Sequence, residues 1–558
     1  MKSDLPISTL PLAALASAWL LPNHAYPWIS AWQEGLALSL LLAAGLLGRH
    51  AARLPTLWAA ALALALASVA LQWGTGRILF HGDALMAALY LAAFGLAIAL
   101  GSSLAAKEPD GRTPALEWLA AGTLAAAIVS VGIALSQWTQ TYVIHFTVSV
   151  DLKPGARPFA NLSQANHFCT AAFLGLCSLV FLHEARRVGR PAFWLGASFL
   201  LLGMVMSGSR TGWLQLAVAV ALVLLLRKRI ALRATARPLL AMVGLYALLT
   251  LAWPALNEAL YLSGGRGVGD QLQGGVRLPL WKSLLDAVAR EPLWGYGWQQ
   301  VALAQQAVAL DHAPVFHIFE HSHNLALDLV LWAGIPVGGA LVLLMSLALL
   351  LQLRALRDAR AVWLMAAALG VLTHSMLEYP IEYAYFLLPT GLCLGAAHAL
   401  CPTAWSLPSR PVALRLWALV LAGVLGVVAV DYLEAEQNHR LLRLESARIG
   451  TVSIESKAPE LRVLDQLQAF LWFARTEARP GMPVEERERM RMTAQRFAYP
   501  PLLLRQALIA GLHGDVADAE RQLALICSLH SPLRCQEGRE NWQQLQSRYP
   551  QLQAVKAP

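Results

Sequence analysis

Residues 84–101 read ALMAALYLAAFGLAIALG and contain no charged side chain. Coiled as an α-helix, a run of this length approaches the ~30 Å thickness of the hydrocarbon core of a membrane. Twelve other apolar runs recur along the chain, separated by loops that are basic or rich in Gly and Pro. Together they predict an all-α fold, a polytopic membrane bundle of about 12–13 transmembrane helices. The runs lie at 5–22, 35–48, 57–74, 84–101, 115–136, 168–183, 193–206, 212–226, 238–254, 323–351, 362–377, 384–401 and 413–431.

The composition supports the same fold class. Of the 558 residues, 57% are hydrophobic and only 14% are charged, whereas soluble domains are typically about 45–50% apolar. The net charge of +9 raises the question of nucleic-acid binding, but Lys and Arg also gather in the cytoplasmic loops of membrane proteins. With the N-terminus inside, the short outer loops contain only Arg77, Lys153, Arg157 and Arg210. We therefore expect a multi-pass protein of the bacterial inner membrane that binds the lipid bilayer and no nucleic acid.

The domain organisation follows from a change of composition near residue 432, where apolar runs give way to charged, amphipathic sequence. Residues 1–431 are predicted to form the membrane domain, with long outer loops at 137–167 and 255–322. Residues 432–558 are predicted to form a soluble α-helical domain on the outer, periplasmic side. This domain is suited to packing on the loops or to holding a protein partner, and the alternative is a solvating cap.

Three local patterns add detail to this organisation. The Gly residues between 264 and 275 predict an irregular stretch in the second outer loop. Residues 503–525 resemble a single tetratricopeptide-type pair of short helices. Cys527 and Cys535 lie in the polar domain outside the cytoplasm, where a disulfide can persist. The other four Cys fall in or at apolar runs, where Cys is usually a small apolar residue.

Polar side chains gather at the outer ends of the apolar runs. Such groups are costly near the bilayer, so a collection of them on one side indicates a functional site. We identify six clusters, at 22–34 (Asn23, His24, Trp28 and Glu34), 157–167 (Arg157, Asn161, Gln164, Asn166 and His167), 207–213 (SGSRTGW), 277–297 (Arg277, Trp281, Pro292, Gly295 and Gly297), 321–324 (HSHN) and 374–385 (His374, Glu378, Tyr379, Pro380, Tyr383 and Tyr385).

Two arginines in these clusters are candidate phosphate ligands. Arg210 lies between two apolar runs on the side where short loops hold few cations. A guanidinium presents paired donors that match phosphate oxygens and stays charged at physiological pH. The alternatives are an internal salt bridge or an Arg that extends its charged end to the membrane surface. Arg277 lies in a long loop, where a simple solvated charge is the competing interpretation.

His323 is a candidate proton acceptor, because a neutral imidazole at the start of a helix can take up a proton near pH 7. A hydrogen-bonded structural His is the alternative. A metal site is a further possibility, since His312, His317, Glu320, His321 and His323 lie close in sequence. Their spacing lacks the i, i+4 pair of a zinc protease, and we expect neither a metal nor a cofactor. No close pair of carboxylates is evident, which disfavours a glycosidase mechanism.

The order of the clusters resembles the O-antigen ligase/polymerase (Wzy_C) superfamily and, within it, the bacterial pilin-type O-oligosaccharyltransferases (PglL-like). The matching motifs are Pro-Asn-His…Pro-Trp…Glu at 22–34, Arg-Pro-Phe-x-Asn-x-x-Gln-x-Asn-His at 157–167, Ser-x-Ser-Arg-x-x-Trp at 207–213, His-Ser-His-Asn at 321–324 and Glu-Tyr-Pro-x-x-Tyr-x-Tyr-Phe at 378–386. The resemblance covers roughly residues 20–400, and five motifs in order on one predicted face are specific.

This resemblance implies a metal-independent glycosyltransferase that moves a glycan from undecaprenyl pyrophosphate to a hydroxyl group. His323 would then be the essential histidine, expected to act as general base, and Arg210 and Arg277 would hold the pyrophosphate. Gln164 and Tyr379 match positions needed for transfer and are expected to position a substrate. We assign the same role to the motif residues Asn324 and His167. The large domain at 432–558 favours a pilin or another periplasmic protein as acceptor.

Three rival functions remain open at this stage. An O-antigen ligase acting on lipid A core, or an O-antigen polymerase, would share the donor but use a sugar hydroxyl as acceptor. A transporter of lipid-linked sugars is a more remote alternative. Such proteins usually have internal repeats and polar residues at mid-membrane, and we find neither feature in this sequence. A membrane scaffold organised by the C-terminal helices is the third.

Overall fold

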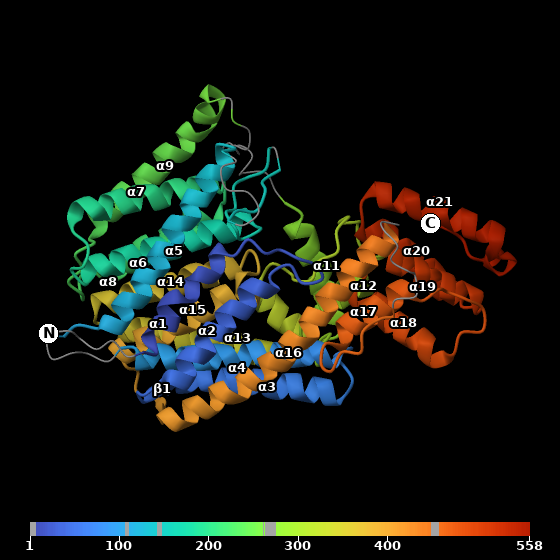
Figure 1. Cartoon of the computed structure of the whole chain (residues 1–558), viewed down its shortest axis with the longest axis horizontal. Coiled ribbons are helices and arrows are strands. Elements are labelled where there is room, and N and C mark those ends of the chain that lie inside the picture. Colours follow the sequence, from blue (N-terminus) through green and yellow to red (C-terminus); the bar gives the residue numbers. More distant parts are fainter. Residues whose placement is uncertain are drawn as a thin grey trace. The chain divides into compact units, whose positions relative to one another are not determined.

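The computed structural model describes residues 7–105, 111–141, 148–153, 155–260, 262, 275–447 and 457–558. Within these ranges seven helices are long and apolar enough to cross a membrane. They are α3 (Thr56–Gly74), α4 (His81–Ser103), α5 (Pro114–Trp138), α6 (Ala165–Glu184), α9 (Ala236–Ala259), α13 (Leu325–Ala355) and α16 (Pro411–Ser446), labelled in Figure 1. Shorter apolar helices are α1 (Thr9–Ala14) with η1 (Leu15–Leu20), α2 (Ala31–Leu47), α7 (Arg190–Met206), α8 (Thr211–Leu226) and α15 (Ala384–Leu400).

The predicted fold class is confirmed: the chain is a multi-pass helical membrane protein, with seven described helices long and apolar enough to cross a membrane. All thirteen predicted spans coincide with helices, including 362–377, which falls on α14 (Ala359–Ser375). The first predicted span begins outside the described residues, and its described part is divided between a short α-helix and a 3-10 helix. How many of the helices cross the bilayer stays a prediction.

The chain divides into two compact units. The first, called the membrane unit below, comprises Met1–Ala63, Leu89–Gln273 and Leu344–Leu425. The second, called the loop unit, comprises Leu64–Ala88, Gly274–Leu343 and Gly426–Pro558. The second long outer loop and the C-terminal helices therefore belong to one unit.

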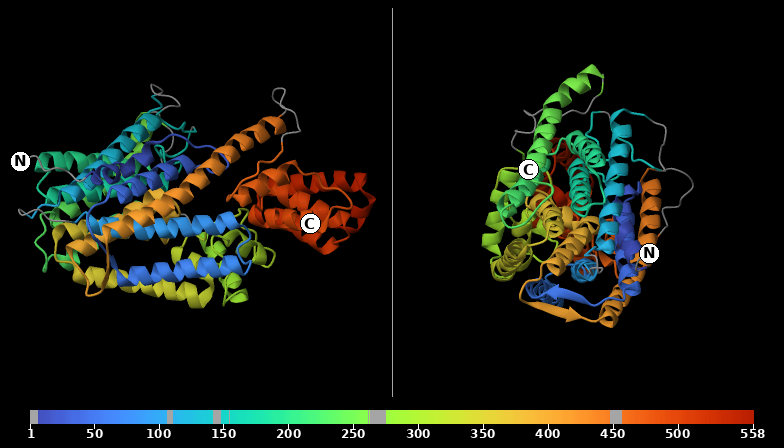
Figure 2. Two further views of the ribbon diagram at one scale, coloured as in Figure 1. Left: turned by 60° about the horizontal axis from the view of Figure 1, so that its bottom comes forward. Right: turned by 90° about the vertical axis from the view of Figure 1, so that its left-hand side faces the viewer.

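The membrane unit is built on closely packed helices. In the described residues α6 packs against α5, α7 and α14, and α14 also contacts α8 and α15. Small residues permit the closest approach: a Cβ added at Gly101 of α4 would lie 2.2 Å from the carbonyl oxygen of Leu392 in α15, so the two backbones nearly touch. At another edge, β1 (Ala52–Pro55) and β2 (Ser406–Ser409) pair antiparallel, with Ala52 opposite Ser409. The two strands are the arrows in the right-hand view of Figure 2.

In the loop unit, α13 is interrupted at Gly334, whose φ of 75° and ψ of 170° are not helical. The backbone groups freed by this break find partners in the segment 292–297. Tyr296 N donates to Leu331 O at 2.7 Å, and Ile335 N donates to Pro292 O at 2.7 Å. Non-helical backbone at membrane depth requires such internal partners. The part of α13 after the break, residues 335–355, is about 31 Å long. This part alone is long enough to cross the membrane, so the predicted span at 323–351 starts earlier than a crossing requires.

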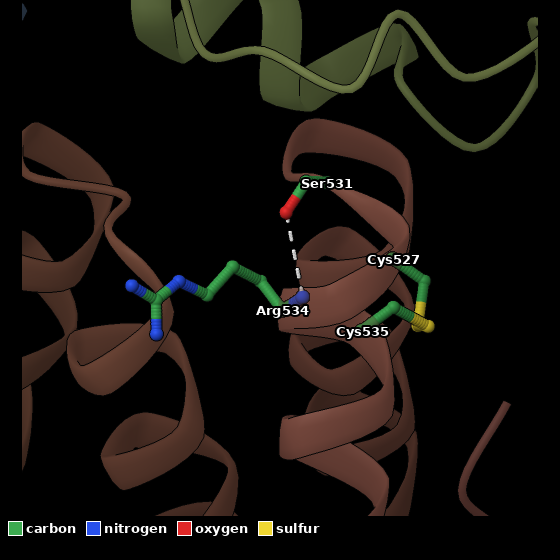
Figure 3. Close-up of a disulfide and its surroundings, with 4 residues drawn as sticks. All are labelled: Cys527, Ser531, Arg534 and Cys535. Carbon is green, nitrogen blue, oxygen red and sulfur yellow. Dashed lines mark hydrogen bonds between the residues drawn. A yellow bond between two sulfur atoms is a disulfide. The ribbon is translucent and has the colours of Figure 1, made fainter.

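The C-terminal helices form the rest of the loop unit. They are α17 (Asp465–Arg475), α18 (Val484–Arg496), α19 (Pro500–Leu512), α20 (Val516–Leu529), α21 (Pro532–Arg548) and η4 (Pro550–Ala554). Their core includes the fully buried Trp542, Leu503 and Leu529. The expected helical pair at 503–525 corresponds to α19 and α20, and a disulfide joins Cys527 to Cys535 beside the Ser531 cap of α21 (Figure 3).

Two described features go beyond the sequence-based expectations for the loop at 255–322 and for the domain boundary at residue 432. The loop predicted at 255–322 contains two helices, α11 (Arg277–Arg290) and α12 (Val301–Val308). The domain boundary expected at residue 432 falls inside α16, which continues to Ser446. The Gly-rich stretch from 264 onward lies outside the described residues up to Gly274, so its predicted irregularity stays a prediction.

Candidate active site

The six polar clusters form two groups in the structure. Those at 22–34, 157–167, 207–213 and 374–385 lie in the membrane unit and are connected by hydrogen bonds. Those at 277–297 and 321–324 lie in the loop unit and are connected through Trp281. Sequence order alone contained no sign of this division. Each group is therefore described by itself.

Glu378 is the centre of the group in the membrane unit. Its side chain is only 5% exposed, and its two carboxylate oxygens accept from two amides at the start of α6. Asn166 Nδ2 donates to Oε1 at 3.1 Å, and Gln164 Nε2 donates to Oε2 at 3.4 Å. The 157–167 motif thus meets the 374–385 motif across more than 200 residues of sequence. The carboxylate orients the amide of Gln164, one of the expected positioning residues.

Aromatic rings surround the second expected positioning residue, His167, which is 1% exposed. Its imidazole lies edge-on to Tyr383 with ring centroids 4.8 Å apart and to Tyr379 with centroids 6.2 Å apart. Neither ring nitrogen has a hydrogen-bond partner. His167 and Tyr379 are therefore together, as the motifs suggested, and His167 packs within an aromatic wall.

A network around Asn161 fixes the loop that precedes α6. Asn161 O accepts from Gln33 Nε2 at 2.6 Å and lies 2.9 Å from His24 Nε2. His24 also contacts Ser163 Oγ, 2.7 Å from its Nδ1. Burial lowers the pKa of His24, and its backbone hydrogen bonds oppose that shift only in part. A neutral His24 is thus a structural link between the first two motifs.

Arg210 stands at the start of α8 and is exposed. The turn before it is held by Arg157, whose Nη1 donates to Ser207 O at 3.1 Å, and by Ser209, whose hydroxyl accepts from Thr211 N at 3.3 Å. A helix N-terminus presents backbone N–H groups and a partial positive charge, which favour an anion. The phosphate-binding role of Arg210 stays a prediction.

His323 lies on a constrained turn in the loop unit. Its φ of 60° is in the left-handed region, which few non-Gly residues adopt. The preceding residue is held on both sides: Ser322 N donates to Asp328 Oδ1 at 2.7 Å, and Ser322 O accepts from Trp281 Nε1 at 2.7 Å. Asn324 caps α13, because its Oδ1 accepts from Leu327 N at 3.1 Å. The turn is thereby fixed before α13 begins.

Two further histidines lie close to His323. Burial lowers the pKa of His317 and lowers that of His321 to about 3, and the nearby His323 lowers both further. Both imidazoles are therefore neutral near pH 7. Arg277 is the first residue of α11, one turn before Trp281. Across the ranges that the structure describes, no group of three or more His, Cys, Asp or Glu side chains is arranged to hold a metal ion.

The sequence profile of the O-antigen ligase family matches residues 195–342, a range that includes Arg210, Arg277 and His323. A second profile, described as the C-terminal part of a virulence-factor membrane-bound polymerase, matches residues 362–541. It includes Tyr379 and most of the C-terminal helices. These two stretches are therefore similar to the O-antigen ligase/polymerase superfamily. No solved structure matches the chain.

Two curated relatives from Acinetobacter baylyi (strain ATCC 33305 / BD413 / ADP1) support this placement. One, named a general O-oligosaccharyltransferase, is 27% identical over 537 residues, which cover 92% of this chain and 91% of the relative. The other, named a ComP-specific O-oligosaccharyltransferase, is 27% identical over 330 residues, 59% of each chain. Family and relatives together support an oligosaccharyltransferase activity, that is, a glycosyltransferase of the membrane.

Sequence reasoning missed the role of two acidic residues. Glu378 was recognised only as one carboxylate among several, because its amide partners lie far away in sequence. Asp328 was passed over as a single acid within an apolar run, although its carboxylate supports the turn that holds His323. Each acid is a single carboxylate, Asp328 in an apolar run and Glu378 in a polar motif. A buried carboxylate needs a hydrogen-bond partner, and this requirement was the sign in the sequence that each acid has a role.

Proposed function

We propose that the protein transfers an oligosaccharide from undecaprenyl pyrophosphate to a Ser or Thr hydroxyl of a pilin-like or other periplasmic protein. The relative that covers nearly the whole chain is an O-oligosaccharyltransferase by name, and such enzymes imply a lipid-linked donor and a protein acceptor. The observation that carries the proposal is the fixed left-handed turn of His323 within the matched family region.

The proposed chemistry needs one base and fixed cations. His323 accepts the proton of the acceptor hydroxyl while its oxygen attacks the anomeric carbon of the donor sugar. The bond from that carbon to the pyrophosphate breaks, and the pyrophosphate leaves with the electron pair. Arg210 and Arg277 stabilise the growing negative charge on the leaving group. Because arginines can supply this stabilisation, we propose a reaction that requires no metal.

We assign substrate positioning to Gln164, Tyr379, Asn324 and His167. Gln164 is held by Glu378, and Asn324 follows the proposed base directly and caps α13. The buried His167 packs edge-on against Tyr379 and supports it, and the partly exposed ring of Tyr379 is a surface on which a sugar ring or a prenyl chain can stack.

The proposed location is the inner membrane, with the active face and the C-terminal helices in the periplasm. The Cys527–Cys535 disulfide supports this orientation, because disulfides persist in oxidising compartments and are rare in the cytosol. We propose two domains, a transferase domain at 1–431 and a periplasmic helical domain at 432–558 that receives the acceptor protein.

The second candidate function is that of an O-antigen ligase or polymerase. The descriptions of the two matching family profiles favour it. It requires a sugar hydroxyl as acceptor in place of a protein hydroxyl. A sugar transporter, the remote alternative, would need no base at all.

The test is co-expression of the full chain with a lipid-linked glycan pathway and candidate pilins, followed by intact-mass analysis of each pilin. We expect one pilin to gain the mass of the glycan, and we expect this gain to persist when membranes are assayed in EDTA. If the pilins stay unmodified while lipid A core or a growing glycan chain becomes extended, the ligase or polymerase function is correct. Loss of transfer in EDTA would contradict the metal-independent reaction.

A further inference from the structure

The turn Ser322–His323–Asn324 is held by its backbone on both sides of the imidazole. Ser322 N donates to Asp328 Oδ1 and Ser322 O accepts from Trp281 Nε1, each at 2.7 Å. Ser322 Oγ lies 3.0 Å from Asn324 O and accepts from Asn324 N at 3.2 Å. These bonds offset the cost of the left-handed φ at His323, which is of order 1–3 kcal/mol for a non-Gly residue.

Asp328 is a buried carboxylate, 3% exposed, in the first turn of α13. An acidic residue there usually serves the helix by capping or by opposing its dipole. Here Asn324 already provides the side-chain cap through Leu327 N. Asp328 instead reaches back to Ser322, six residues earlier. Its hydrogen bond therefore fixes the turn of His323, which a capping role does not require.

Asp328 also faces His323 electrostatically, as do His317 and His321 from the preceding segment. Burial lowers the pKa of both neighbouring imidazoles, that of His321 to about 3, so both are neutral where the enzyme is expected to work. Among these three neighbours Asp328 is the acid. A carboxylate near an imidazole favours its protonated form.

We propose that Asp328 is the positioning residue of His323: it fixes the turn through Ser322 and stabilises the imidazolium that forms during transfer. This role rests on the proposed function. In the step concerned, the proton of the acceptor hydroxyl moves to His323 while the new bond to the anomeric carbon forms and the bond to the pyrophosphate breaks. No proton passes to Asp328 in this step, as none passes to the carboxylate behind a catalytic histidine in hydrolytic triads.

The test is the pH–rate profile of the purified full-length enzyme with a synthetic undecaprenyl-pyrophosphate-linked disaccharide and the pilin that gains the glycan in the co-expression assay. Asp328→Asn keeps an oxygen for Ser322 N but removes the charge. We expect kcat to fall ~10- to 100-fold with little change in KM for the acceptor. We also expect the acid limb of the profile to move about one pH unit lower, because protonation of the base is no longer favoured.

Matched variants separate the two parts of the role. Trp281→Phe removes the donor to Ser322 O and keeps the ring, so kcat should fall while the acid limb stays in place. Asp286→Asn removes a carboxylate that also bonds a His, His312, but lies on the exposed side of α11, and it should leave the profile unchanged. If Asp328→Asn does not fold, Asp328→Glu carries the test and should retain the wild-type acid limb at reduced kcat.

An Asp328→Asn enzyme with the wild-type rate and acid limb would overturn the inference. So would an Asp328→Glu enzyme whose acid limb moves lower. Failure of the proposed function has a different signature: His323→Ala would then retain transfer, whatever the result at Asp328. An inactive His323→Ala enzyme beside an unshifted Asp328→Asn profile would refute only the role of Asp328.

Discussion

The polar group around Glu378 and the turn of His323 differ in how they are held. In the membrane unit a buried carboxylate binds the side chains of Gln164 and Asn166. In the loop unit a buried carboxylate binds the backbone of Ser322, beside a residue with a left-handed φ. The first arrangement orients the side chains of Gln164 and Asn166, and the second fixes the backbone conformation next to His323. Replacements should therefore act on substrate positioning in the membrane unit and on the reacting base in the loop unit.

The largest effect outside His323 is expected at Arg210. Arg210→Ala should lower kcat ~100- to 1,000-fold, since a preorganised charge that stabilises a leaving group contributes that much. Arg210→Lys should retain part of the activity because it keeps the charge but loses the paired donors. The matched control is Arg227→Ala at the other end of α8, where an exposed Arg ends the helix. Transfer rates measured by intact mass check this, and equal losses at both positions would contradict it.

The next largest effect is expected at Glu378. Glu378→Ala leaves two half-buried amides without this acceptor, at up to ~1–3 kcal/mol for each group that stays unsatisfied. Glu378→Gln keeps one carbonyl oxygen and should be intermediate. We expect KM for a substrate to rise at least ~10-fold in the Ala variant, while the acid limb stays in place. An acid-limb shift here, like the one expected for Asp328→Asn, would remove the distinction between the two groups.

A smaller effect is expected from the disulfide of the loop unit. Cys527→Ser should destabilise the C-terminal helices by ~2–3 kcal/mol, because the bond closes a short loop in the unfolded chain. Thermal unfolding of the full chain in detergent, with and without reductant, measures this. Reductant should lower the unfolding temperature of the wild type and have no effect on the variant. Wild-type thiols that react fully with maleimide before reduction would contradict the pairing and its periplasmic location.

The smallest effect concerns pH and should be confined to the loop unit. The pKa of His321 is lowered to about 3 in the folded chain, first by burial and then by the charges of His323 and Arg496. Between pH 6.5 and 3 the unfolded chain therefore binds a proton that the folded chain does not. Stability is lost as pH falls through this window, by at most about 1.4 kcal/mol per pH unit. His321→Asn should flatten the fall of unfolding temperature between pH 7 and 5, and an unchanged slope would contradict this.

The sequence predicted the fold wherever structure follows from local pattern. The uncharged run 84–101 lies within α4, His81–Ser103, because an apolar segment of that length is stable as a helix in lipid. The break in α13 was not predictable in this way. The partners that make Gly334 tolerable are Pro292 and Tyr296, about forty residues earlier. Pro336, two residues after Gly334, marks a possible helix interruption in the sequence, but the sequence does not show which distant groups bind the backbone there.

The candidate site was predictable only where its residues belong to motifs that are local in the sequence. The motifs identified Gln164 and Tyr379 as candidate positioning residues on one predicted face, and the structure brings their motifs together through Glu378. The motifs also placed His323 beside Asn324 at the start of a helix, where the structure has them. The motifs did not predict the residues that hold the turn of His323. Asp328 and Trp281 bind the backbone of Ser322, and hydrogen bonds to backbone groups leave no pattern in side-chain spacing.

The most direct test of the account is transfer by His323→Ala in the co-expression assay, measured as the intact mass of the acceptor. The variant should insert and unfold much like the wild type, since the hydrogen bonds of Ser322 that hold the turn are retained. We predict no detectable glycan on the acceptor while the lipid-linked donor accumulates. Wild-type levels of glycosylated acceptor would contradict the assignment of His323 as the base.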